Sequence, residues 1–77
     1  MRLDQLALNR PSHIAGIDWS VLGERQAQRL RELGFDDGVE VEALHRGAWK
    51  GPIACRVGRM IIALRRTQAA AVRVEPA

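Results

Sequence analysis

The fold is decided where the sequence changes its period, in residues 29–43, which read RLRELGFDDGVEVEA. Leu30 belongs to the apolar stripe of a helix, and Gly34 follows as a residue that adopts the left-handed conformation of a helix end without strain. Phe35 can then fold back onto Leu30, as in a Schellman motif. Beyond Gly38, apolar residues alternate with acids, which is the two-residue period of a half-buried strand. The stretch therefore predicts a helix that ends at Gly34 and a strand that begins after Gly38.

Upstream of this stretch, the helical period extends back over residues 20–33, where Asp18 or Ser20 can cap the helix. Residues 12–17 are predicted to form a strand, and a bulge near Gly16 would turn both of its isoleucines inward. The N-terminal half is thus expected to be one strand followed by one helix.

Downstream, the pattern predicts strands, apart from one helical turn in residues 65–70. Gly58 and Arg59 have the composition of a two-residue hairpin turn with glycine first. Residues 60–64, MIIAL, are apolar on both faces, so we expect this strand at the centre of a small barrel and not at an edge. The other strands are expected over residues 39–43, 53–57 and 72–74, with a loop over residues 45–52.

The length and composition of the chain restrict its class. The 77 residues allow one domain, residues 1–77, with a mainly β fold: about five antiparallel strands closed into a barrel, and one α-helix inserted after the first strand. The single cysteine excludes an intramolecular disulfide. The longest apolar run is five residues, whereas a membrane-spanning helix needs about twenty. We therefore expect a cytoplasmic protein without a membrane span.

The net charge of +3 is unevenly distributed along the chain. Residues 43–74 contain seven Lys and Arg residues and no Asp or Glu. A basic surface of this kind could face nucleic acid, an acidic protein or anionic lipid. It could equally be a set of solvated charges that protect strand edges from pairing.

The residue inventory argues against an enzyme. His13 and His45 are the two histidines, they lie on separate predicted elements, and neither has an acid arranged beside it in the sequence. No glycine-rich phosphate-binding loop is present in the sequence. Because a general acid or base needs a positioned partner, we expect no catalysis.

A metal site has only weak candidates, Glu42, His45 and Cys55, which lie near one predicted hairpin. Carboxylate, imidazole and thiolate are all transition-metal ligands. Pairing about the centre of the hairpin loop, however, places His45 opposite Ala54, which puts His45 and Cys55 on opposite faces of the sheet. We expect no cofactor, and at most an adventitious transition metal.

The two tryptophans, Trp19 and Trp49, are the aromatic residues most able to form a contact site. A tryptophan near a loop tip can pack on its own barrel or can anchor a partner. The residues that flank Trp49 are small or charged and offer little apolar cover, so both interpretations stay open.

Two blocks of the sequence, RLRELGFDDG in residues 29–38 and IALRRTQAAAVRV in residues 62–74, resemble the FeoA family. These are small cytoplasmic proteins of bacterial ferrous iron uptake with an SH3-like barrel. The resemblance covers essentially the whole chain. The chain departs from the family pattern at Asn9, where a glycine is usual, and in residues 18–22.

The resemblance implies an accessory protein that binds or regulates a FeoB-type permease, with the cytoplasmic GTPase part of the permease as the contact. It implies no iron carriage and no nucleotide hydrolysis by this chain itself. Such a protein would lie in the cytoplasm, peripheral to the inner membrane through its partner, as a monomer or weak homo-oligomer. Exposed residues that could make the contact form two sets: Trp19, Leu22, Arg25 and Arg29 on the helix side, and Leu44, Trp49 and Lys50 on the hairpin.

Two alternatives remain beside this interpretation. The charge asymmetry suits a small basic barrel that binds nucleic acid, although few aromatic residues are available to stack on bases. The resemblance also allows a regulatory metal-responsive module, because FeoA-type domains occur fused to metal-responsive repressors.

Overall fold

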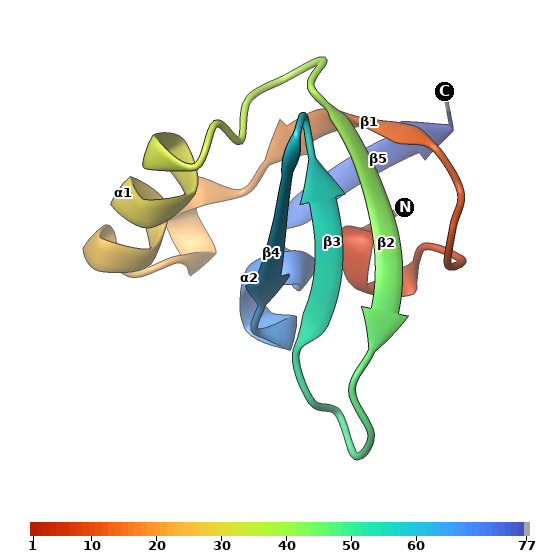
Figure 1. Cartoon of the computed structure of the whole chain (residues 1–77). Coiled ribbons are helices and arrows are strands. Elements are labelled where there is room, and N and C mark those ends of the chain that lie inside the picture. The colour runs from red at the N-terminus through yellow and green to blue at the C-terminus, as the bar shows by residue number, and fades with distance from the viewer. Residues whose placement is uncertain (77) are drawn as a thin grey trace.

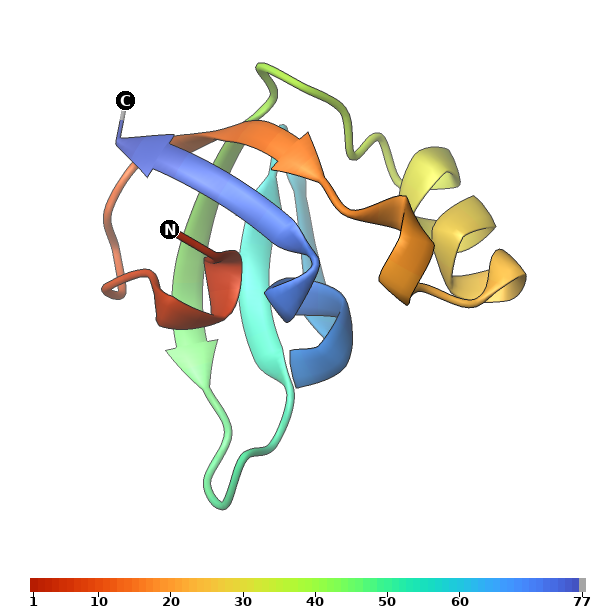
Figure 2. The same ribbon diagram turned by 180° about the vertical axis from the view of Figure 1, so that it is seen from behind.

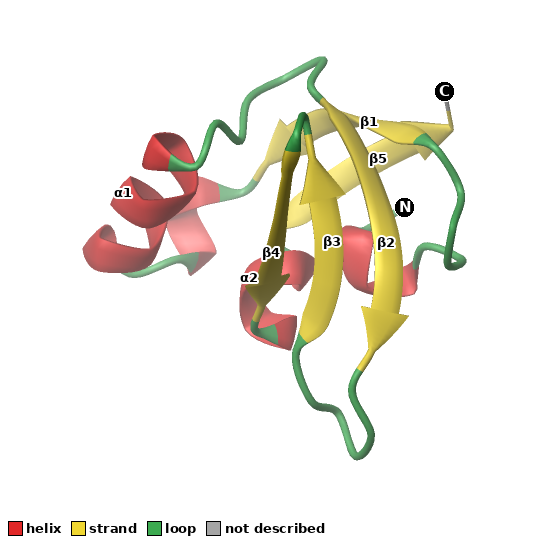
Figure 3. Cartoon of the chain, in the orientation of Figure 1, coloured by secondary structure: helices red, strands yellow, loops and turns green. Residues whose placement is uncertain are grey.

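A single antiparallel sheet forms the framework of the computed structural model, which describes residues 1–76 (Figures 1 and 3). The five strands lie in the order β4-β3-β2-β1-β5, so neighbours along the chain are mostly neighbours in the sheet. The mainly β fold with a helix after the first strand is therefore confirmed. The strands are β1 (Ser12–Ile17), β2 (Glu40–Arg46), β3 (Ile53–Val57), β4 (Met60–Leu64) and β5 (Val72–Pro76).

Four short helical segments connect and cover the strands: η1 (Leu3–Gln5), η2 (Trp19–Val21), α1 (Glu24–Glu32) and α2 (Arg66–Ala70). Of these, η1 and α2 lie behind β2, β3 and β4 in Figure 1 and in front of them in Figure 2, so both cover the same face of the sheet. Fully buried side chains from these layers form one core, which includes Leu3, Ile14, Leu30, Ile53 and Leu64. No helix within residues 1–76 is long and apolar enough to cross a bilayer.

The main helix begins later than the sequence pattern predicts. Asp18 caps a separate 3₁₀ turn, η2, because its carboxylate accepts hydrogen bonds from the Ser20 backbone N–H and hydroxyl. Leu22 then runs in extended conformation, and Gly23 is the N-cap of α1. The expected helix over residues 20–33 is thus a turn followed by a helix, since the local cap at Asp18 separates the two.

The predicted helix end is confirmed. Gly34 has a φ of +90°, and its N–H donates to the Arg31 carbonyl oxygen over 3.0 Å. The Phe35 N–H donates to the Leu30 carbonyl oxygen, also over 3.0 Å. These are the two hydrogen bonds of a Schellman motif, and they direct Phe35 into the core.

The predicted bulge in β1 is also present. The pairing of β1 with β5 shifts register between Ile14 and Gly16. Ile14 is buried and Ile17 packs against the core, as the bulge requires. A Cβ atom on Gly16 would collide with the guanidinium of Arg73 on β5, so glycine also permits this close approach.

The prediction that residues 60–64 lie at the centre of a closed barrel is wrong. They form β4, which pairs with β3 alone and lies at one edge of the sheet. The two edge strands β4 and β5 are not hydrogen-bonded to each other, so the barrel is open. Leu64 is buried on the inner face, but Ile61 on the outer face is 67% exposed. The two-sided apolar run therefore does not reflect burial on both faces.

Candidate interaction surfaces

The β2–β3 hairpin presents its tip to solvent. The Gly51 N–H donates to the Ala48 carbonyl oxygen over 3.0 Å, which closes a four-residue turn around Trp49 and Lys50. Both central residues have positive φ, +57° for Trp49 and +61° for Lys50, as in a type I′ turn. The tip is tight because Gly47 and Gly51 have no side chains: a Cβ on either would lie 3.0–3.1 Å from a carbonyl oxygen.

Trp49 is 96% exposed at this tip. The alternative that it packs on its own barrel is therefore wrong. Positive φ is unfavourable for non-glycine residues other than Asn and Asp, so the backbone at Trp49 is strained. This strained residue carries an aromatic ring that is exposed to solvent. Exposed aromatic residues of this kind are typical anchors of protein–protein contacts.

The two other hairpin candidates lie differently. Lys50 is exposed beside Trp49. Leu44 lies before the tip, where the β2–β3 register shifts between Ala43 and His45, and its side chain is half-buried. Of the hairpin set, Trp49 and Lys50 thus share the tip.

The structure divides the helix-side candidates among three environments. Leu22 is buried in the core, so it is not available to a partner. Trp19 is half-buried against the core, and the guanidinium carbon of Arg31 lies 4.4 Å from the centroid of its ring. Arg25 and Arg29 are exposed and line a different pocket from the one beside Trp19. The expected single patch on the helix side does not exist.

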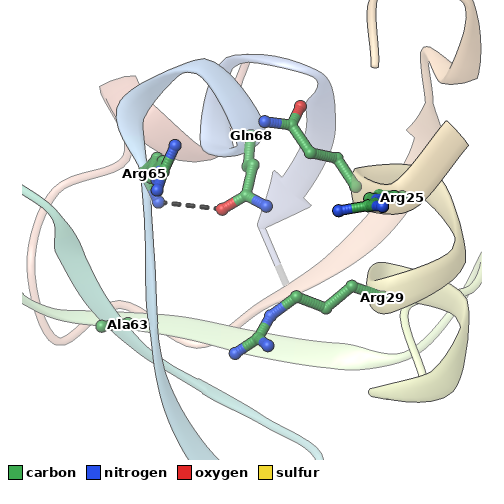
Figure 4. Close-up of a pocket in the computed structure, with 6 residues that line it drawn as sticks. Arg25, Arg29, Ala63, Arg65 and Gln68 are labelled. Carbon is green, nitrogen blue, oxygen red and sulfur yellow. Dashed lines mark hydrogen bonds between the residues drawn. The ribbon is translucent and has the colours of Figure 1, made fainter. Parts of the chain in front are cut away.

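Arg25 and Arg29 instead line a pocket of about 580 Å³ between α1 and β4 (Figure 4). The opposite wall is formed by Ala63 at the end of β4, Arg65 after it, and Gln68 on α2. Arg65 and Gln68 are not among the site residues that the sequence predicts. No local signal could have found them, because the pocket forms only where α1 meets β4 and α2, which follow α1 in the chain after β2 and β3.

The three metal candidates do not form a site. Glu42 pairs with Arg56, with 3.4 Å between Oε1 and Nη1. His45 lies opposite Ala54 in the β2–β3 register, as predicted, and Cys55 lies opposite Ala43. Burial raises the pKa of the Cys55 thiol to about 11, so it is protonated at neutral pH. Within residues 1–76, no group of three or more His, Cys, Asp or Glu side chains could hold a metal ion.

The fold and surface are those of a small, SH3-like β domain whose hairpin tip is exposed to solvent. Within residues 1–76, its side chains form no cluster of metal ligands. Residues 1–76 match the FeoA domain family. The chain therefore belongs to that family. None of the curated protein sequences matches it closely enough to count as a relative.

Several solved structures are similar to the whole chain. Iron(II) transport protein A from Clostridium thermocellum is 31% identical with a TM-score of 0.86, over 100% of this chain and 46% of that one. A zinc complex of FeoA from Stenotrophomonas maltophilia, described as a prokaryotic SH3 domain protein, is 33% identical with a TM-score of 0.82, over 97% and 89% of the two chains. A manganese-dependent transcriptional repressor shares the fold alone, at 16% identity, a TM-score of 0.88, and 100% and 41% coverage.

Proposed function

We propose that this protein is an accessory factor of bacterial ferrous iron uptake that binds the cytoplasmic GTPase part of a FeoB-type permease. The observation that carries this proposal is the match of residues 1–76 to the FeoA domain family. The similar proteins named for iron(II) transport, and as a candidate activating factor of that transport, support the same process. This role would place the protein in the cytoplasm, at the inner membrane only through its partner.

We propose further that it acts by binding and not by catalysis, without a resident cofactor. The structure corrects one premise drawn from the sequence, because it brings Glu75 on the neighbouring strand to 3.6 Å from His13. Both side chains are exposed, at 41% and 66%, so this is a surface pair and not a general base held in a site. The protonated, buried Cys55 thiol is a poor nucleophile, because the thiolate is the reactive form. The possible metal ligands near the hairpin lie in different environments, so they do not support a regulatory metal site.

The contact is proposed at the hairpin tip. Trp49 supplies a large apolar ring, and Lys50 supplies a charge beside it. A domain of this size offers an interface near the lower end of the usual range, about 1,200 Å² in total. We therefore expect weak binding that depends strongly on one anchor.

The test is an NMR titration of the labelled protein with the soluble GTPase domain of the permease. We expect shift changes centred on residues 48–51. Trp49→Ala should weaken the complex about thirtyfold, since loss of a central aromatic commonly costs about 2 kcal/mol. Lys50→Ala is the matched control at the neighbouring position and should weaken it less than fivefold, as expected for an exposed charge.

Two outcomes would contradict this proposal at different levels. If no shift changes occur at high concentration, the soluble domain is not the partner. If the Trp49 variant binds normally, the partner stands and the hairpin anchor is wrong.

Binding of nucleic acid is the second candidate, and the excess of basic residues in residues 43–74 favours it. Phosphate contacts weaken steeply with salt. A titration with single-stranded RNA at 50 and 200 mM salt separates the two functions. We expect no binding at either salt concentration.

A further inference from the structure

The free edge of β4 has backbone groups available for pairing. The two-residue turn at Gly58 and Arg59 makes Val57 and Met60 the hydrogen-bonded pair that closes the β3–β4 hairpin. Hydrogen-bonded and non-hydrogen-bonded pairs alternate along an antiparallel ladder. The backbone N–H and C=O groups of Ile61 and Ala63 therefore point away from β3, to the open side.

The opposite edge of the sheet is protected, whereas β4 is not. On β5, the Val74 N–H donates to the Met1 carbonyl oxygen over 2.7 Å, and Arg2 forms a bridge with Arg73. The N-terminal segment thus covers the β5 edge. Among the described residues, no strand other than β3 pairs with β4. Its exposed side chains are also apolar, Met60 at 41% and Ile61 at 67% exposure.

The space beside this edge is lined by positive charge. The pocket between α1 and β4 is lined by Arg25, Arg29 and Arg65, and no Asp or Glu lines it. None of these three arginines forms an ion pair within residues 1–76. Figure 4 shows Arg29 extending from α1 into the space between the helix and the strand. Three arginines without an ion-pair partner are thus available to a segment that lies along β4.

Gln68 adds a fixed donor on the pocket wall. Its side chain is 7% exposed, and its Oε1 accepts a hydrogen bond from the Arg65 backbone N–H over 3.0 Å. This bond holds the amide so that its nitrogen is turned toward α1 (Figure 4). That nitrogen has no hydrogen-bond partner among the described residues. It is a donor for a carbonyl or carboxylate oxygen.

We propose that an extended, acidic segment of a partner protein adds to β4 as a sixth strand, with its carboxylates held by Arg25, Arg29 and Arg65. Strand addition at an open edge obtains its affinity from main-chain hydrogen bonds, here to Ile61 and Ala63. The arginines and Gln68 supply the selectivity for acidic side chains. If the segment belongs to the permease, this inference rests on the proposed function; binding of an acidic strand as such does not.

A second copy of this chain is a poor occupant of the same edge. Pairing β4 with β4 would bring the arginine-lined pockets of two molecules together, and like charges oppose such association. The arginines that repel a second copy attract an acidic strand. Charge complementarity therefore favours a heterologous acidic segment.

The test uses the whole protein and a synthetic peptide of sequence TEVEVET, with blocked termini, in an NMR titration at low salt. We expect binding to slow the amide hydrogen exchange of Ile61 and Ala63. The amides of Met60, Ile62 and Leu64 already bond to β3, so they are the internal control and should change little. The peptides TQVQVQT and TKVKVKT should bind at least tenfold more weakly.

Two variants separate the charge from the edge. Arg29→Glu should weaken binding of the acidic peptide about fivefold, as expected when an exposed attraction becomes a repulsion. Arg10→Glu is the matched control, because it makes the same change of charge on an exposed residue that does not line the pocket. Ala63→Pro removes an outward N–H, which an edge strand tolerates, and should weaken binding at least tenfold. If Ala63→Pro does not fold, Arg29→Glu and the exchange pattern still decide.

Four results would overturn the inference. One is binding of the acidic peptide without slower exchange at Ile61 and Ala63. Another is equal binding of the basic peptide. A third is inorganic phosphate or RNA that reproduces the peptide's shift changes, which would make the pocket a simple anion site. The last is protection of Ile61 and Ala63 in the free protein together with dimers in sedimentation, which would assign the edge to a second copy.

Discussion

Gly34 is the residue at which backbone geometry matters most for the helix end. Its φ of +90° is unfavourable for any side chain with a Cβ, yet nothing lies within 4 Å of the position that a Cβ would occupy. The cost of a substitution is therefore backbone strain and not a steric clash. Two hydrogen bonds of the Schellman motif, and the entry of Phe35 into the core, depend on this conformation.

We expect Gly34→Val to lower the free energy of unfolding by about 1–2 kcal/mol, because a β-branched residue opposes the left-handed conformation. For a domain of this size, such a loss lowers Tm by roughly 4–16 °C. The control is Arg10→Ala, at an exposed arginine, which should change Tm little. Equal melting temperatures for the two variants would show that Gly34 does not determine the helix end. Thermal denaturation followed by circular dichroism measures both.

Cys55 predicts a pH dependence of stability. Burial raises the pKa of its thiol from 9.0 to about 11. Between these values the folded protein retains a proton that the unfolded chain loses, so stability is full below pH 9 and falls as pH rises toward 11. The shift corresponds to roughly 2–3 kcal/mol.

Urea unfolding at pH 8 and pH 11 measures this loss. Cys55→Ala is the control, because it removes the thiol while every other titrating group stays. We expect the wild type to lose roughly 2–3 kcal/mol more than the variant over this range. Parallel losses in the two proteins would mean that the thiol does not carry the effect.

At the scale of elements, the tip of the β2–β3 hairpin combines an unfavourable backbone conformation with an exposed aromatic ring. Its turn has positive φ at Trp49 and Lys50, where Asn and Gly are the residues that a type I′ turn favours. We expect the double variant Trp49→Asn, Lys50→Gly to raise the free energy of unfolding by about 1–2 kcal/mol, since it relieves two strained residues. The same variant should lose binding to the permease domain.

Chemical denaturation and the NMR titration together test this exchange of stability for binding. The control is Trp49→Ala alone, which keeps a non-glycine residue at positive φ and should leave stability nearly unchanged. A double variant less stable than the wild type would show that the tip is held by contacts of the tryptophan and not strained. Retention of full binding by the double variant would remove the proposed anchor.

At the scale of the molecule, the sheet, η1, α1 and α2 share one hydrophobic core. Residues 1–76 contain no cluster of side chains that could hold a metal ion. We expect Tm to be the same, within error, in excess EDTA and in added zinc or iron(II). Domains built on a structural metal unfold when it is removed, because metal binding supplies their folding free energy. Loss of the cooperative transition in EDTA would contradict this expectation.

Much of the architecture follows from short stretches of sequence. The end of α1 at Gly34, the bulge at Gly16, the turn at Gly58 and the pairing of His45 with Ala54 are all as predicted. The helix end and the turn depend on neighbours within a few residues, and the pairing of His45 with Ala54 depends on the short loop between the two strands. Family membership was equally accessible, because it rests on two blocks of sequence.

Other features were decided by tertiary structure alone. The order of the strands placed β4 at an edge although its sequence is apolar on both faces, and the packing of the chain buried Leu22 in the core. The pocket joins Arg29 on α1, Arg65 after β4 and Gln68 on α2. Local sequence determines conformation, but it does not specify which distant segments meet, because that depends on how the entire chain buries its apolar surface. The open, basic edge of β4 is a product of that packing.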